Sequence, residues 1–119
     1  MKHYTQIPTE RQFRAATGKS QSEFESLSAD LEKFYAEEYG LTYEDYIKEN
    51  VTETPKLQNL GEALFFVLFQ LKNGLTWDSL SVVFGMSTAT AHTNFNVFLA
   101  LLEQMLEKKS HAQAGVQWC

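Results

Sequence analysis

The sequence predicts an all-α fold, a compact helical domain that contains a tri-helical helix-turn-helix. Three observations support this prediction. Capping residues and glycines bracket each apolar segment, apolar residues recur three and four positions apart within the segments, and both signals agree along the same stretches. In addition, apolar residues make up 44% and aromatic residues 13% of the 119 residues, which excludes a disordered chain and allows a sizeable core.

The first two helices are expected in residues 10–17 and 21–39. Thr9 can cap the first, and Gly18 ends it. Ser20 and Glu23 have the spacing of a capping box, and Gly40 stops the second helix. The apolar positions of this second helix form one stripe: Phe24, Leu27, Leu31, Phe34 and Tyr35. Its carboxylates lie mainly off that stripe, which favours a solvated acidic face over a metal or general-acid site.

A third short helix is expected in residues 43–50, capped by Thr42 and followed by a linker over residues 51–56. Residues 57–73 are apolar almost all round, and the run from Ala63 to Phe69 alone does not distinguish a helix from a buried strand. Asn59 with Glu62 gives a start signal and Lys72-Asn73-Gly74 a stop signal, which favours a helix. A helix that is apolar on all sides is a central one, so we expect it in the core, although Phe65 and Phe66 could instead line a pocket or a subunit interface.

Residues 75–107 are expected to form two helices joined by a tight turn. Thr76 can cap the first helix, Gly85 can end it in the left-handed conformation, and Ser87 can cap a longer helix to about Glu107. This arrangement is a helix-turn-helix. We expect one core to include Phe65, Leu68, Leu80, Phe84, Met86 and Phe95. Apolar residues that flank the seam of the last helix meet either the N-terminal helices or another copy: Val97, Leu99, Leu101 and Leu106.

Residues 57–106 resemble the helix-turn-helix near the N-terminus of insertion-sequence transposases that carry a DDE nuclease domain. The matching parts are the apolar helix of residues 60–72, Gly74-Leu-Thr-Trp77, residues 80–90 and the tail of residues 98–106. The resemblance implies a DNA-binding module that recognises element ends in transposition, a form of DNA recombination. The nuclease carboxylates of that family belong to a domain that this chain is too short to contain, so we expect a truncated or repurposed relative, and no enzyme.

Helix-turn-helix modules place the start of the second helix in the major groove. With Gly85 as the turn, the expected DNA-binding positions on that helix are Ser87, Thr88, Ala89, His92, Thr93 and Asn96. Thr76 and Trp77, at the start of the preceding helix, would lie near the DNA backbone. Asn pairs well with adenine, Ser and Thr bond bases or phosphates, and Ala89 could touch a thymine methyl group.

The charge of this region departs from the family pattern. Residues 87–107 contain neither Lys nor Arg, and the whole chain has a formal net charge of −5. We therefore expect weak binding of double-stranded DNA by the chain alone, strengthened by a homodimer or by a DDE nuclease domain or partner protein. The alternative is a non-catalytic protein-interaction or oligomerisation domain that docks through Leu99, Leu101 and Leu106.

The sequence contains no motif that indicates a disulfide-stabilised, metal-binding or membrane protein. The single cysteine, Cys119, allows no disulfide framework, and the three histidines lack metal-ligand spacing, so we expect no metal and no other cofactor. No segment is long and apolar enough to span a membrane, and we expect an intracellular protein of the cytoplasm or nucleoid, or of a eukaryotic nucleus. The expected organisation is one helical domain, residues 1–109, with N-terminal helices in 9–50, the helix-turn-helix region in 57–107, and a disordered tail in 110–119.

Overall fold

A computed structural model of the chain describes residues 7–50, 57 and 59–114, and all its regular structure there is helical. Six helices follow one another: α1 (Glu10–Thr17), α2 (Gln21–Tyr39), α3 (Tyr43–Asn50), α4 (Leu60–Asn73), α5 (Trp77–Phe84) and α6 (Thr88–Ala114). The all-α prediction is confirmed. The expected linker, residues 51–56, lies outside the described residues.

Local capping signals fix where these helices begin and end. At the start of α2, the Glu23 amide donates to Ser20 Oγ and the Ser20 amide donates to Glu23 Oε1, each at 3.0 Å. Hydrogen bonds to the Glu23 carboxylate, first from the backbone amide of Ser20 and then from its side chain, lower the pKa of Glu23. Asn59 caps α4 through the Glu62 amide at 2.9 Å. Gly40 ends α2 in the left-handed conformation, with φ 77°, which a residue with a side chain adopts only under strain.

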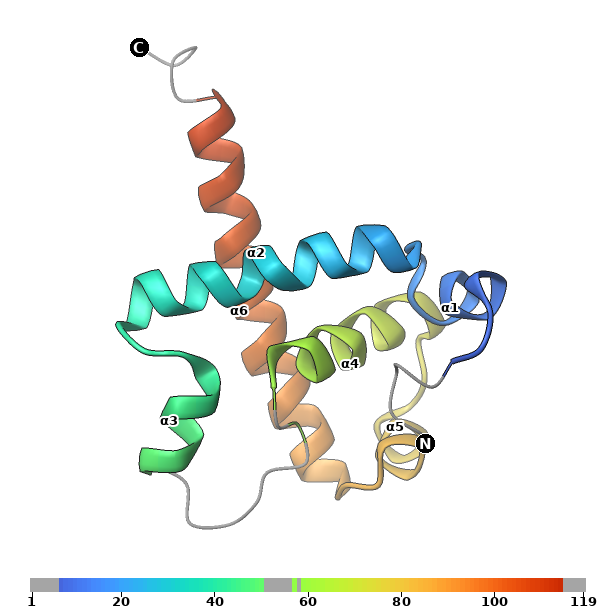
Figure 1. The fold of residues 1–119 in the computed structure, drawn as a ribbon. Coiled ribbons are helices and arrows are strands. Elements are labelled where there is room, and N and C mark those ends of the chain that lie inside the picture. The colour runs from blue at the N-terminus through green and yellow to red at the C-terminus, as the bar shows by residue number, and fades with distance from the viewer. Residues whose placement is uncertain (1–6, 51–56, 58, 115–119) are drawn as a thin grey trace.

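Helix α4 is the centre of the molecule. Its side chains at Ala63 and Phe66 are fully buried, and Phe65 is only 2% exposed, so these phenylalanines belong to the core and line no open pocket or subunit interface. Helices α1, α2 and α6 pack around α4, while α5 lies against α6 (Figure 1). Helix α1 forms part of this cover, with the ring centroids of Phe13 and Phe65 6.1 Å apart.

The six residues expected to share one core do so. Phe65, Leu68, Leu80 and Met86 are buried, and Phe84 and Phe95 are half-buried against them. The Phe84 ring meets the Phe66 ring edge-on, with centroids 4.8 Å apart, and also contacts the rings of Phe65 and Phe69. Phe84 thereby joins the helix-turn-helix to the central helix.

The loop from α4 to α5 is held by a buried side-chain amide. Gln70 Nε2 donates to the Leu75 carbonyl at 2.7 Å, and the Leu75 amide donates back to Gln70 Oε1 at 3.1 Å. Gln70 is only 9% exposed, so leaving its amide unpaired would be costly. The pair therefore fixes where α5 begins relative to α4.

Helix α6 continues to Ala114, past the expected end near Glu107. The additional residues include lysine, alanine and glutamine, which are good helix formers, and Gly115 follows them. Residues 115–119, the rest of the expected tail, lie outside the described residues. The later turns of α6 run past α2 and project from the other helices (Figure 1). Lys108 Nζ ties them to the end of α2, 2.7 Å from Glu38 Oε1 and 3.9 Å from Glu37 Oε2.

Candidate nucleic-acid interface

The turn between α5 and α6 has a firmly held backbone. Gly85 adopts φ 68° and ψ 38°, and the next amide, of Met86, donates to the Ser81 carbonyl at 3.0 Å. The Met86 side chain is 8% exposed and packs into the core. Glycine in the left-handed conformation followed by a buried apolar residue is a common way to end a helix. It sets the direction in which α6 leaves α5.

A polar clamp joins the first turns of α5 and α6. The Thr88 hydroxyl donates to Asp78 Oδ1 at 2.7 Å. Ser81 Oγ donates to the Asp78 carbonyl at 2.6 Å and lies 3.5 Å from Thr88 Oγ1. Of the expected DNA-binding residues, Thr88 is thus exposed but already committed to an internal partner. A hydrogen bond to an ionised carboxylate is stronger than a neutral one, so the clamp orients the two helices.

Trp77 forms an apolar counterpart to this clamp. Its ring is half-buried, 5.4 Å from the Phe95 ring and 4.8 Å from the imidazole of His92, which it meets edge-on. Trp77 was expected near the DNA backbone. It lies at the start of α5, where it supports α6 and holds His92 in place.

Four expected residues form one exposed stripe along the start of α6: Ala89, His92, Thr93 and Asn96. Their spacing of three and four positions places them on a single side of the helix. Asn96 Nδ2 lies 3.3 Å from His92 Nε2. The two groups are close enough to share a hydrogen bond, whose direction depends on the tautomer of the imidazole.

The two remaining expected residues, Thr76 and Ser87, are exposed N-caps. Thr76 Oγ1 accepts from the Ser79 amide at 3.1 Å, and Ser87 Oγ accepts from the Thr90 amide at 3.1 Å. Each hydroxyl therefore performs a structural task at the edge of the candidate surface. The structure thus brings all eight residues to the adjoining starts of α5 and α6, with four of them in the open stripe.

The candidate surface is polar but carries little positive charge. Between Asn73 and Glu107 the sequence has no Lys or Arg, and Asp78 adds a carboxylate at the clamp. Sequence reasoning missed the pairing of Asp78 with Thr88. The two residues are ten positions apart and no short-range pattern links them. Their pairing follows only from the angle between α5 and α6.

Within the described residues, no three His, Cys, Asp or Glu side chains gather closely enough to hold a metal ion. None of the described helices is both long and apolar enough to cross a membrane.

Residues 55–108 match the family model described as helix-turn-helix of DDE superfamily endonuclease. The matched segment contains α4 and α5 and most of α6. The match confirms the resemblance seen in the residues themselves and indicates a DNA-binding function. No curated protein and no solved structure matches the chain.

Proposed function

We propose that this chain binds double-stranded DNA through the exposed start of α6, because its residues 55–108 match the family model described as helix-turn-helix of DDE superfamily endonuclease. The observation that carries the proposal is the stripe of Ala89, His92, Thr93 and Asn96. It lies at the start of the second helix of the motif, the part that reads base edges in a major groove. The opposite side of the same helix is buried, so this side is the one that can face DNA.

Three side chains of the stripe have a defined use in this proposal. Asn96 can pair with adenine through both its amide atoms, once it gives up its contact with His92. Thr93 offers a hydroxyl to a base or phosphate, and Ala89 offers a methyl group to thymine. Thr76 and Ser87 flank the stripe and can approach the phosphates while their oxygens keep the helix caps.

The finer role that we propose is recognition of the ends of a mobile element. In this role the module positions a transposase on DNA, and strand cleavage belongs to a DDE nuclease domain elsewhere in the protein or in a partner. Purified chain incubated with supercoiled plasmid and magnesium should leave the plasmid intact, and nicking that survives repurification would contradict this division of labour.

The charge of the surface limits affinity. Phosphate contacts supply most non-specific binding, and each neutralised phosphate adds about 0.9 to the steepness of a plot of log K against log salt. With two basic residues described between residues 57 and 108, Lys72 and Lys108, we expect a slope of roughly −2 or shallower. Useful affinity then requires two linked copies or the rest of a transposase, since linked weak sites gain effective concentration.

Selection from a random pool of DNA duplexes is the test, because the target sequence need not be known in advance. The tagged chain, immobilised at low salt, should enrich a short motif over several rounds. The Asn96→Ala variant should lose preference at one or two positions of that motif, while Glu25→Gln, on α2, should leave it unchanged. Fluorescence anisotropy with the selected and a shuffled duplex then measures the preference. If the native chain bound both duplexes with equal affinity, sequence-specific recognition would be ruled out.

The expected alternative docking surface does not exist as one exposed face. Leu101 is 6% exposed and belongs to the core, and Leu99 is half-buried against it. Leu106 is 44% exposed. The reason is that α2 and α4 cover the side of α6 that carries Leu101. An interaction role therefore needs a different surface.

A further inference from the structure

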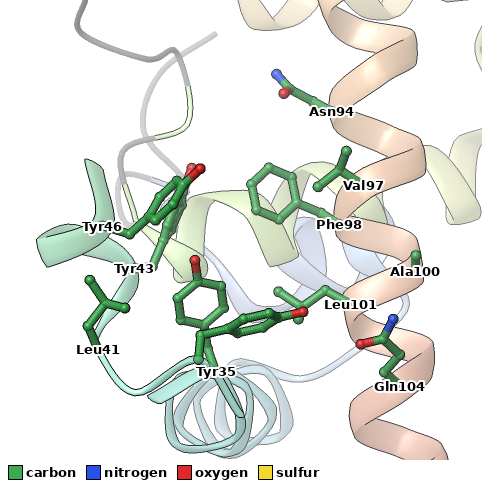
Figure 2. A pocket seen from close by; sticks show the side chains of 11 residues that line it. Tyr35, Leu41, Tyr43, Tyr46, Asn94, Val97, Phe98, Ala100, Leu101 and Gln104 are labelled. Atoms are coloured by element: carbon green, nitrogen blue, oxygen red, sulfur yellow. The ribbon is translucent and has the colours of Figure 1, made fainter. Parts of the chain in front are cut away.

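A pocket of about 510 Å³ opens between α6 and the corner where α2 meets α3 (Figure 2). Tyrosines from α2 and α3 form one wall, and Val97, Phe98 and Leu101 of α6 form the other. The pocket is separate from the stripe of residues proposed to face DNA. Its residues have no part in the proposed DNA contacts.

Aromatic rings follow one another across three helices, from the tyrosines of α2 and α3 to Phe98 of α6. Tyr35 lies 4.7 Å from Tyr39 and 5.8 Å from Tyr43, measured between ring centroids, and Tyr43 lies 5.6 Å from Phe98. Tyr39 is nevertheless 51% exposed and Tyr46 is 43% exposed. Large rings that line a concave surface and remain open to solvent are typical of binding sites.

This wall is also held in place. The Tyr43 hydroxyl donates to the Leu57 carbonyl at 3.0 Å, which fixes α3 to the chain entering α4. Burial, followed by the neighbouring Tyr35 and Glu62, raises the pKa of Tyr43 to about 12. The phenol therefore stays neutral and bonded at physiological pH. A rigid aromatic surface loses little entropy when a ligand binds it.

The elements around the pocket are acidic. Residues 30–46 contain six carboxylates and one lysine, Lys33, whereas the described residues that line the pocket itself carry no charge. Glu37 and Glu38 share Lys108. Burial, and secondly the charge of Glu44, raise the pKa of Glu32 on α2. The carboxylates of α2 and α3 would attract a positively charged segment.

We propose that the pocket binds an arginine side chain presented by an arginine-rich peptide segment of a partner protein. A guanidinium group stacks on tyrosine faces and is attracted by their negative π surface. Its aliphatic stem can lie along Val97, Phe98 and Leu101, as the stems of long cationic side chains do on apolar surfaces. The surrounding carboxylates attract the positive segment and repel nucleic acid, so this site and the DNA site select opposite partners.

The probe is a fluorescein-labelled peptide with four arginines spaced by glycine and serine, and its matched control carries citrulline at the same positions. Citrulline keeps the planar shape but lacks the charge. The arginine peptide should bind saturably in fluorescence anisotropy. The citrulline peptide should bind with an affinity at least about fivefold lower. Tyr46→Ala should weaken arginine-peptide binding by a similar factor. Val82→Ala, which changes a 79%-exposed apolar residue on α5, should leave it unchanged.

Two charge-removing variants distinguish binding at the pocket from non-specific electrostatic attraction between the acidic chain and the basic peptide. Glu44→Gln should weaken the arginine peptide more than Glu25→Gln, which removes an exposed carboxylate near the start of α2. Equal losses from both variants, or equal binding of the arginine and citrulline peptides, would overturn the proposal. Thermal melts followed by circular dichroism should show Tyr46→Ala folded like the native chain. If it is not, Tyr39→Phe and Tyr39→Ala supply the same comparison at a more exposed ring.

Two further measurements address other occupants. Free arginine amide should displace the peptide only at concentrations far above that of the peptide, whereas equal potency would point to a small-molecule site and against a peptide partner. Sedimentation should show no self-association that Tyr46→Ala removes, since such an effect would assign the pocket to a second copy of the chain. An unexpected result in either measurement leaves the DNA proposal unaffected, because that proposal rests on other residues.

Discussion

The two faces of α6 differ in what they contribute. On one face, Ala91, Leu102 and Met105 are at most 5% exposed and pack in the core. On the other, His92, Thr93 and other residues of the stripe are exposed. The first face fixes the helix against α4 and α5, and the second is left for a partner. Fold and proposed function therefore depend on separate residues of one helix, and substitutions can test them independently.

The largest expected effect comes from the buried face. Leu102→Ala should reduce the free energy of unfolding by about 3 kcal/mol, because it removes a large apolar side chain from a closed core. Asn96→Ala, on the exposed face, should change it by less than about 0.5 kcal/mol. Urea denaturation followed by circular dichroism measures both. Comparable losses at the two positions would show that the faces are not distinct.

Phe84→Ala tests how firmly the helix-turn-helix is joined to the central helix. The ring is half-buried but meets Phe65, Phe66 and Phe69, so we expect a loss of about 3 kcal/mol in the same denaturation experiment. Val82→Ala, at an exposed position of α5, is the control and should have little effect. A loss below about 1 kcal/mol for Phe84→Ala would mean that α5 is held by α6 alone.

Thr88→Val tests the clamp at the border between the two faces. It keeps the shape of the side chain but removes the hydroxyl that donates to Asp78, and should cost about 1 kcal/mol. Thr93→Val makes the same change at an exposed position of α6 and should cost less.

Asp78→Asn should strengthen DNA binding, because it removes a negative charge beside the proposed contact surface. Weaker DNA binding by Asp78→Asn would indicate that the clamp matters more than the charge.

The last prediction concerns stability at high pH. Since burial raises the pKa of Tyr43 from 10.0 to about 12, its contribution to stability is fully present below about pH 10 and is lost as the pH rises through about 12. Ultraviolet absorbance titration should show one tyrosine that ionises last, after Tyr35, whose pKa is also raised by burial. Tyr43→Phe should remove that late step, and Tyr39→Phe should not. A late step that persists in Tyr43→Phe would assign the buried phenol to another residue.

Much of the fold could be predicted because the signals are local. Thr9, Ser20, Asn59 and Thr76 each cap a helix at the position their sequence spacing indicates. The largely apolar character of α4 likewise predicted a central helix, which the burial of most of its side chains confirms. Helix caps and apolar periodicity act within a few residues, so a single sequence contains them.

Features that depend on distant residues could not be predicted in this way. The Asp78–Thr88 clamp and the burial of Leu101 both follow from the angles between helices, which no local pattern encodes. The tyrosine pocket joins Tyr35 and Phe98, which lie far apart in the sequence. The exposed stripe of α6 was found from the geometry of helix-turn-helix modules, because its polar residues resemble any solvated surface.

The most direct test of the central claim, that the exposed start of α6 faces DNA, is an NMR titration of isotopically labelled chain with the selected duplex. The amide signals of Thr76, Trp77 and the stripe residues should shift progressively, together with the side-chain amide of Asn96. Signals from α2 and from Leu102 and Met105 should stay in place. Shifts concentrated on α2 and α3, with the start of α6 unchanged, would contradict the claim.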